Sequence, residues 1–253
     1  MSNRVVAAVL CGGEGSRLRP LTYYFQKSMI PVGSVQKPLL EYIVALLRSH
    51  GFRDMVFLAG YKHEQILNYF GDGSRFGVRI NYSLDREGFR GTGWALLNAY
   101  RLGLFKRFDH VLVYYGDILS DMDLTRMFRQ HVKTGACATL AVSKGYRLPV
   151  GVVSLDGLRV MEVREKPKME IPVSIGVLVL RVNALEVLED ISETRVGKEL
   201  DIMSHLLPEL VARGEPVYAY LTDCFWYDVG SAEKYEKLDN SIVDQLFEKV
   251  SRV

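Results

Sequence analysis

A glycine-rich segment directly after an apolar run is the first place in this sequence where chemistry could occur. The apolar run covers residues 5–10, and the segment continues as Leu10-Cys11-Gly12-Gly13-Glu14-Gly15-Ser16 before Arg17. Glycines let the backbone approach a ligand closely, so that successive N–H groups can converge on phosphate oxygens. The segment lacks the Gly-Lys-Ser/Thr of a P-loop, and Leu18 stands where the dinucleotide fingerprint has its third glycine. A tight turn therefore explains the glycines as well as a phosphate cradle does.

Cations near this segment favour the phosphate-binding interpretation. Arg17, Arg19 and Lys27 all follow the first glycines closely, as the positive charge of a triphosphate site would need to. Each cation could instead be a solvated surface charge, and for Arg19 that is the simpler interpretation.

The elements around these residues indicate an α/β fold with a mostly parallel, Rossmann-like central sheet flanked by helices, because short apolar runs alternate with segments of helical period. We expect strands at residues 5–10, 55–58, 78–82 and 111–115, and helices at 38–50, 63–70 and 94–102. Ligands bind beyond the carboxyl ends of the strands in such sheets. Gly12-Gly13 and Gly116-Asp117 both fall at such positions.

The pattern becomes strand-rich after about residue 136. We expect strands at 138–142, 150–155, 159–163, 175–180 and 217–221, and helices at 200–213 and 232–246. The prediction is one domain over residues 1–253, with a first half at 1–135 and a half for a second substrate at 136–253.

Composition limits the partners. The formal net charge is only +2 and the charges are interspersed, which argues against a nucleic-acid or membrane surface. Cys11, Cys137 and Cys224 are far apart, so neither a disulfide framework nor a zinc site is expected. The N-terminus has no signal-peptide pattern, and no apolar run could span a bilayer. We therefore expect a cytoplasmic protein.

Several motifs together resemble the signature of the sugar-phosphate nucleotidyltransferases over essentially the whole chain. They are Gly12 to Thr22, Lys27, Pro31-Val32, Lys37 to Tyr42, Gly91-Thr92-Gly93, Gly116-Asp117, Glu165-Lys166-Pro167 and Trp226 to Gly230. The resemblance implies a Mg²⁺-dependent enzyme that joins a nucleoside triphosphate to a hexose 1-phosphate, giving a nucleotide sugar and pyrophosphate. It implies that residues 1–135 are the nucleotide-binding half and residues 136–253 the sugar-phosphate-binding half.

The resemblance also assigns roles to individual residues. It implies that Arg17 and Lys27 are catalytic and that Asp117 and Asp228 bind Mg²⁺. It implies nucleotide binding by Leu10, Gly12, Gly13, Gly15, Ser16, Gly91 and Thr92, and sugar-phosphate binding by Gly151, Glu165, Lys166 and Gly176.

The chain departs from the family pattern at four positions. Gln26 replaces a proline, Tyr115 and Ser174 stand where asparagines are common, and Trp94 stands where a small residue is common. These departures bear on which sugar and nucleotide are used more than on the reaction. The overall match favours a mannose- or heptose-1-phosphate guanylyltransferase, followed by a glucose-1-phosphate thymidylyl- or uridylyltransferase.

The implied chemistry needs no general base, because the second pKa of a phosphate monoester is about 6 and the attacking phosphate is already largely ionised. This agrees with the five scattered histidines, which form no catalytic triad pattern. Hard carboxylate oxygens suit Mg²⁺, which needs only one or two of them beside substrate phosphates. For Asp117 and Asp228 a helix cap or a structural hydrogen bond is the alternative.

Two other functions compete. A metal-dependent glycosyltransferase would use an Asp-x-Asp motif, and Asp121-Met122-Asp123 has that form. These aspartates directly precede a helical segment at 124–131, so an N-cap is the simpler explanation. A non-catalytic nucleotide-sugar-binding subunit is the other candidate, although it would have no reason to keep all four of Arg17, Lys27, Asp117 and Asp228. No C-terminal β-helix repeat is expected, and the chain is a candidate homo-oligomer.

Overall fold

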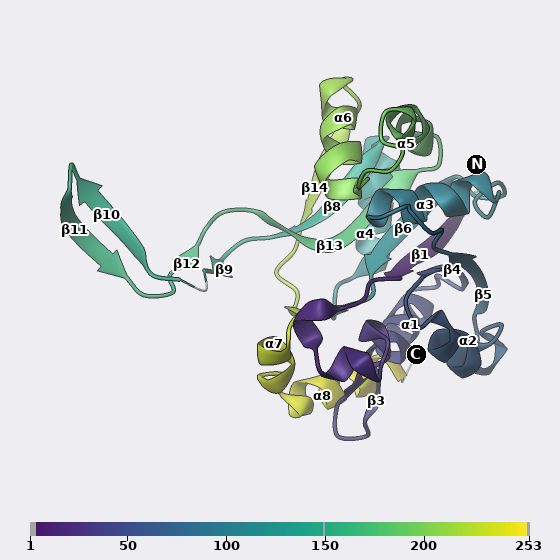
Figure 1. Ribbon diagram of the computed structural model, residues 1–253, viewed down its shortest axis with the longest axis horizontal. Coiled ribbons are helices and arrows are strands. Elements are labelled where there is room, and N and C mark those ends of the chain that lie inside the picture. The colour runs from purple at the N-terminus through teal and green to yellow at the C-terminus, as the bar shows by residue number, and fades with distance from the viewer. Residues whose placement is uncertain (1–3, 149, 252–253) are drawn as a thin grey trace.

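A seven-stranded sheet with strand order β14-β8-β13-β6-β1-β4-β5 runs through the molecule (Figure 1). The structure is a computed structural model, and it describes residues 4–148 and 150–251. The N-terminal part of the sheet consists of β1 (Val5–Cys11), β4 (Asp54–Ala59), β5 (Arg79–Leu84) and β6 (His110–Tyr115). These four strands pair in parallel, so their carboxyl ends meet at one edge of the sheet.

The C-terminal part extends the same sheet beyond β6. Strand β13 (Val173–Arg181) pairs antiparallel with both β6 and β8 (Ala138–Ser143), while β14 (Val217–Leu221) pairs in parallel with β8. Only β13 among these seven strands runs against its neighbours. The predicted mostly parallel sheet is therefore confirmed.

Helices cover both faces of the sheet, because alternate residues of each strand point to opposite faces. Ala7 and Val9 of β1 belong to one apolar core and Val6 and Ala8 to the other. The first core is closed by α1 (Leu39–Ser49), α2 (His63–Phe70), α4 (Leu124–Thr134) and α8 (Asn240–Ser251). The second is closed by α3 (Thr92–Arg101), α5 (Ala184–Glu193) and α6 (Leu207–Ala212). No helix among the described residues is long and apolar enough to cross a membrane.

The structure corrects two predicted helices. The predicted helix at 232–246 is two helices, α7 (Ala232–Glu236) and α8, because the side chain of Asp239 accepts a hydrogen bond from the backbone N–H of Ser241 and starts a new helix. The predicted helix at 200–213 begins only at the π-helical turn η5 (Ile202–Leu206). Leu200 is held outside it, since its carbonyl oxygen accepts from the backbone N–H of Gly93 at 2.8 Å. Helix α5 was not predicted.

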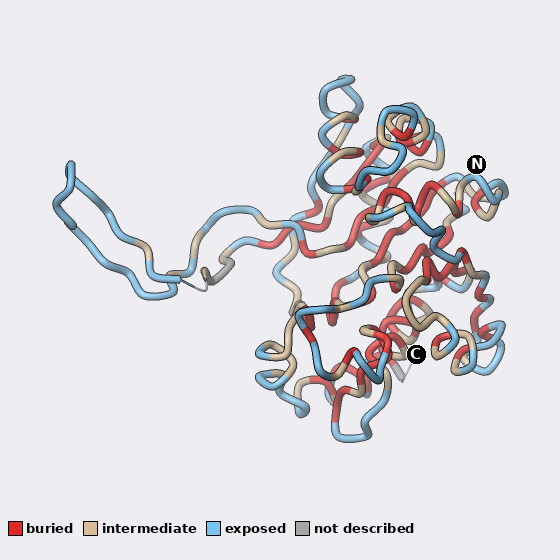
Figure 2. Tube along the Cα trace, in the orientation of Figure 1, coloured by how far each residue is buried: buried red, intermediate tan, exposed pale blue. Residues whose placement is uncertain are grey.

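Short antiparallel pairs complete the fold. They are β2 (Pro31–Val32) with β3 (Lys37–Pro38), β7 (Ile118–Ser120) with β15 (Trp226–Asp228), β9 (Tyr146–Arg147) with β12 (Lys168–Met169), and β10 (Val152–Asp156) with β11 (Arg159–Arg164). The last two pairs form an arm that projects from the body between β8 and β13 (Figure 1). The β10–β11 hairpin at its end is exposed almost throughout (Figure 2).

Candidate active site

Two clefts meet at the edge of the sheet where β1 and β6 end. The first has a volume of about 440 Å³ and is lined by Leu10, Gly12 and Gly13 from the glycine-rich loop and by Gly91 and Thr92 at the start of α3. The second, of about 490 Å³, is lined by Arg17, Gly176 and Asp228. Tyr115 and Asp117 line both clefts. Asp117 therefore stands at the junction between them.

The glycine-rich loop lies open along the first cleft. A Cβ atom on Gly13 would meet nothing within 4 Å, so a ligand can approach the backbone there. Gly15 adopts φ +63°, which favours glycine, and its carbonyl oxygen accepts from the Thr22 hydroxyl at 3.0 Å. Gly15 and the adjacent Ser16 are not among the residues that line either cleft.

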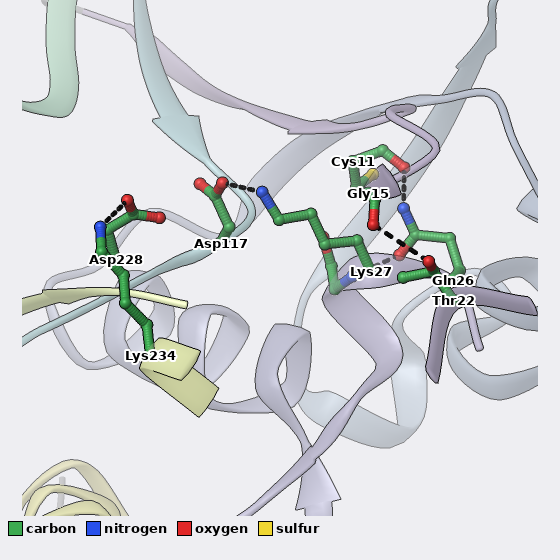
Figure 3. Close-up of polar contacts among 9 residues, drawn as sticks. Cys11, Gly15, Thr22, Gln26, Lys27, Asp117, Asp228 and Lys234 are labelled. Atoms are coloured by element: carbon green, nitrogen blue, oxygen red, sulfur yellow. Dashed lines mark hydrogen bonds and ion pairs between the residues drawn. The ribbon is translucent and has the colours of Figure 1, made fainter. Parts of the chain in front are cut away.

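Gln26 anchors the segment that carries Lys27. Its buried side-chain amide donates from Nε2 to the carbonyl oxygen of Cys11 at 2.6 Å, and its Oε1 accepts from the backbone N–H of Ser28 at 2.6 Å (Figure 3). These bonds tie the turn η3 (Lys27–Met29) to the end of β1. A proline could make neither bond, so the departure from the family pattern has a structural role here.

Lys27 and Asp117 form an ion pair between the two clefts. The ammonium group of Lys27 donates to Oδ2 of Asp117 (Figure 3). The side chains are only 15% and 20% exposed, so the pair is partly shielded from solvent screening.

Asp228, at the end of β15, lies beside Asp117, which occupies the turn between β6 and β7. In the β7–β15 pair Asp228 is opposite Ile118, and the backbone N–H of Val229 donates to the carbonyl oxygen of Asp117 at 2.8 Å. Oδ2 of Asp228 accepts from Nζ of Lys234 in α7 at 2.6 Å (Figure 3). No group of three or more His, Cys, Asp or Glu side chains suited to a metal occurs in the part of the chain that the structure describes. The two aspartates are thus a pair of carboxylates, each held by a lysine.

Thr92 at the first cleft is held by Asp201, which was not among the predicted site residues. Its backbone N–H and its hydroxyl both donate to Oδ1 of Asp201, at 2.9 and 3.0 Å. A Cβ on Gly91 would lie 2.4 Å from the carbonyl oxygen of Leu200. The Gly-Thr-Gly stretch therefore packs directly on the segment before η5, and only a glycine fits at its start.

The predicted sugar-phosphate residues divide into two groups. Gly176, with φ +76°, lines the second cleft, where a Cβ would press on Ile118 and Tyr115. Gly151, Glu165 and Lys166 lie on the projecting arm, and they are not among the described residues that line either cleft. The structure does not bring these three residues together with Asp117.

The competing Asp-x-Asp motif has structural partners. Asp123 is the N-cap of α4, since its Oδ1 accepts from the backbone N–H of Arg126 at 2.8 Å. Asp121 accepts from the backbone N–H of Phe225 and pairs with Lys249. The N-cap explanation is confirmed for Asp123.

Asp85 in the first cleft was not among the predicted site residues. Asp85 directly follows β5, so its position after a predicted strand was the signal that could have revealed it. A Cβ on Gly12 would lie 2.3 Å from Oδ2 of Asp85, which shows how closely the carboxylate packs on the glycine-rich loop. Burial of the carboxyl group raises the pKa of Asp85 to about 6.

Comparison with known proteins adds a family match. A family model described as Nucleotidyl transferase matches residues 6–245. The chain is 33% identical to the UTP–glucose-1-phosphate uridylyltransferase of Synechocystis over 90% of this chain and 61% of the relative. It is 31% identical to the D-glycero-alpha-D-manno-heptose 1-phosphate guanylyltransferase of Aneurinibacillus thermoaerophilus, over 93% of this chain and 97% of the relative. It is 29% identical to the mannose-1-phosphate guanylyltransferase of Mycobacterium tuberculosis, over 92% of this chain and 63% of the relative. The chain thus spans less than two thirds of the first and third of these relatives.

Solved structures share the fold. A putative glucose-1-phosphate thymidylyltransferase from Bacillus anthracis, in complex with a sucrose, superposes with a TM-score of 0.73 at 20% identity, over 92% of this chain and 93% of that one. HddC from Yersinia pseudotuberculosis, complexed with GMP-PN, superposes with a TM-score of 0.68 at 19% identity, over 92% of this chain and 97% of that one.

Proposed function

Because this chain belongs to the nucleotidyl transferase family, we propose that it transfers a nucleotidyl group from a nucleoside triphosphate to a sugar 1-phosphate and releases pyrophosphate. The observation that carries the proposal is the meeting of two clefts at Asp117, beside the ammonium group of Lys27. A bimolecular reaction between two phosphates needs two binding spaces that share one point, with positive charge at that point.

The first cleft would hold the triphosphate. The open backbone at Gly13 supports this assignment, as do Leu10, Gly12, Gly91 and Thr92 along the same cleft. Gly15 and Ser16, which line neither cleft, would hold the conformation of the glycine-rich loop without touching the triphosphate. The second cleft would hold the sugar 1-phosphate against Gly176 and Arg17. Gly151, Glu165 and Lys166 would have to reach the sugar from the arm.

The chemistry is an in-line displacement at phosphorus. An oxygen of the sugar 1-phosphate attacks the α-phosphorus of the triphosphate and forms a new P–O bond. The bond from the α-phosphorus to the oxygen that bridges to the β-phosphate breaks, and pyrophosphate leaves with that electron pair. Lys27 and Arg17 would offset the negative charge that gathers at the junction, and no side chain has to remove a proton.

The donor set fits a magnesium ion. Asp117, in the turn before β7, and Asp228, on β15, offer carboxylate oxygens from adjoining segments. Hard oxygen ligands are those that Mg²⁺ prefers. When bound, Mg²⁺ would neutralise phosphate charge between the two substrates. Lys27 and Lys234 already balance these carboxylates, so they would share this role with the ion.

Among the substrates we favour GTP with mannose 1-phosphate or a related hexose or heptose 1-phosphate. Two of the relatives named above are guanylyltransferases, and the chain matches nearly the whole length of the heptose 1-phosphate enzyme. The uridylyltransferase relative supports glucose 1-phosphate with UTP as the alternative, and glucose 1-phosphate with dTTP stays a second alternative. Association of two or more copies stays a prediction that sedimentation velocity would test.

The test is a matrix of GTP, UTP, dTTP, ATP and CTP against several hexose and heptose 1-phosphates, with pyrophosphate measured with and without Mg²⁺. We expect pyrophosphate and a nucleotide sugar in equal amounts for at least one pair, and only with the metal. Release of a nucleoside diphosphate instead would indicate a glycosyltransferase. Tight nucleotide-sugar binding without turnover for every pair would indicate a non-catalytic subunit.

A further inference from the structure

The segment that leads into Lys27 lies at the surface of the molecule. It consists of the short turn η2 (Leu21–Tyr23), residues 24–26 and the turn η3, which begins at Lys27. Residues 24–26 belong to no helix or strand, and the three aromatic residues before Gln26 are exposed. A lysine carries its charge on a flexible four-carbon stem. The position of the backbone in this segment therefore decides whether the ammonium group of Lys27 lies at Asp117.

Helix α2 holds this segment through the side-chain amide of Gln65. Its Oε1 accepts from the backbone N–H of Gln26 at 2.7 Å, and its Nε2 donates to the carbonyl oxygen of Tyr24 at 2.7 Å. An amide can accept at one atom and donate at the other, so Gln65 fixes the backbone on both sides of Phe25. Gln65 is not among the described residues that line either cleft. It can therefore act on a substrate only through the segment that it holds.

Tyr61, just before α2, makes a second link to the same segment. Its hydroxyl donates to the carbonyl oxygen of Thr22 at 3.1 Å, and its backbone N–H donates to the carbonyl oxygen of Gly12 at 2.9 Å. The hydroxyl of Thr22 in turn donates to the carbonyl oxygen of Gly15 at 3.0 Å (Figure 3). The start of α2 thus joins the glycine-rich loop and the segment before Lys27 in one hydrogen-bonded unit.

The position of Gln26 is passed on to Lys27 through buried contacts. The side chain of Gln26 ties η3 to the end of β1 and caps the turn at the backbone N–H of Ser28. The turn packs tightly on the end of β6, because a Cβ on Gly116 would lie 2.7 Å from Oγ of Ser28. A shift of Gln26 would therefore move the turn, and with it Lys27, relative to Asp117.

We infer that Gln65 is a positioning residue for Lys27: by fixing the backbone on both sides of Phe25, it keeps the ammonium group of Lys27 at Asp117. The inference rests on the proposed function, since it assigns a residue that serves the transfer at the junction of the two clefts. A small misplacement of a group at the reacting atoms strongly slows a reaction, even when its cause lies outside the site. Gln65 thus contributes to turnover without contacting either substrate.

Gln65→Met tests this assignment, because methionine has a similar length and makes neither hydrogen bond. We expect kcat to fall by about 10- to 100-fold, the range for a misplaced group. KM for each substrate should stay within about 3-fold of wild type. Gln65→Glu keeps the acceptor for Gln26 and loses the donor to Tyr24, so its kcat should lie between the two. Asn68→Met, at an exposed amide of the same helix, is the matched control and should keep the wild-type kcat.

A double-mutant cycle distinguishes positioning from a structural role alone. If Gln65 acts through Lys27, Gln65→Met should change kcat by less than about 2-fold in a Lys27→Met background, because the group that it positions is already gone. The full loss of the single variant, repeated in that background, would overturn the inference. Wild-type kcat in Gln65→Met, with or without a lower Tm, would overturn it as well.

The chemical reactivity of Lys27 gives a measurement that does not depend on turnover. Brief acetylation with acetic anhydride, followed by mass spectrometry, would compare Lys27 with Lys37, whose side chains are 15% and 46% exposed. Loss of the carboxylate contact favours the neutral, reactive amine, so labelling of Lys27 relative to Lys37 should rise in Gln65→Met and not in Asn68→Met.

This measurement also separates the inference from the proposed function. If no triphosphate reacts in the wild-type chain, the proposed function fails. The relative labelling of Lys27 then decides whether Gln65 holds the ammonium group at Asp117, and unchanged labelling in Gln65→Met would overturn the inference. If pyrophosphate is released but Gln65→Met behaves as wild type in both assays, the proposed function stands and the inference fails.

Discussion

The backbone N–H of Val229 donates a hydrogen bond to the carbonyl oxygen of Asp117 at 2.8 Å. This bond continues the β7–β15 pairing and places Asp228 next to Asp117, although the two aspartates are far apart in the sequence. Had they lain on opposite sides of the molecule, they could not share one metal ion. Their adjacency is the relationship on which the following predictions depend.

Replacing Asp117 with asparagine should abolish Mg²⁺-dependent turnover and leave the fold intact. The amide keeps the size of the side chain but loses the charge that would hold the ion and balance Lys27. We expect kcat to fall by about 10²- to 10³-fold, the range for a preorganised electrostatic group, in steady-state assays over a Mg²⁺ titration. Asp223→Asn, at an exposed position, is the matched control. Near-normal turnover in Asp117→Asn would remove this residue from the mechanism.

Lys27→Met should destabilise the transition state more than it destabilises the complex with either substrate. Lys27 stands at the junction of the clefts, where charge develops during transfer, so we expect a loss of about 3–4 kcal/mol in kcat/KM, most of it in kcat. Steady-state kinetics with each substrate varied in turn would measure this. A rise in KM for a single substrate at unchanged kcat would show that Lys27 only binds that substrate.

Gly116→Ala should displace Asp117. A Cβ there would lie 2.6 Å from the carbonyl oxygen of Leu10 and 2.7 Å from Oγ of Ser28. The strand β6 or the loop must therefore shift. Overpacking of this kind costs about 1–3 kcal/mol of stability, so both Tm and kcat should fall.

Gly13→Ala serves as the contrast, because a Cβ at Gly13 meets nothing within 4 Å. It should leave Tm nearly unchanged and raise KM for the triphosphate, since only ligand approach is hindered. Equal effects of the two variants on Tm would contradict the geometry at Gly116.

Acidification should destabilise the fold through His131. This histidine is buried, with its Nδ1 at 2.9 Å from Oγ1 of Thr139 and its Nε2 at 3.1 Å from Nδ1 of His110. Burial, with the nearby His110 and Arg181, lowers the pKa of His131 from 6.5 to about 3. The unfolded chain therefore binds a proton that the native state does not between these pH values, and stability falls as pH decreases from 6.5.

Urea unfolding at several pH values would measure this effect. One such histidine contributes at most about 2 kcal/mol between pH 6.5 and 5, at about 1.4 kcal/mol per pH unit. His131→Gln should flatten the pH dependence by that amount relative to wild type, while His63→Gln, on a partly exposed residue, should not. The same slope in wild type and His131→Gln would show that His131 does not couple folding to protons.

The sequence by itself determined the strands of the sheet and the edge of the sheet at which a ligand site is expected. Apolar runs such as Val5–Cys11 and His110–Tyr115 are buried on both faces, so their strand character is readable without tertiary context. The glycines and Asp117 could be placed at the ligand edge because they directly follow such strands. Local chemistry also fixed the cap at Asp123, where the capping side chain lies three residues before the N–H that it binds.

Only the tertiary structure decided which of these residues meet. The pairing of β7 with β15 brings Asp228 to Asp117. The contact of Leu200 with Gly93 delays the start of one predicted helix, and the side chain of Asp201 holds Thr92 at the cleft. The projecting arm keeps Glu165 and Lys166 apart from the two clefts, which no local pattern could show. Asp85 follows a predicted strand, but only the packing of three strand ends places its carboxylate against Gly12 and Gly60. Spacing along the chain fixes local conformation, whereas contacts between distant segments depend on the packing of the whole sheet.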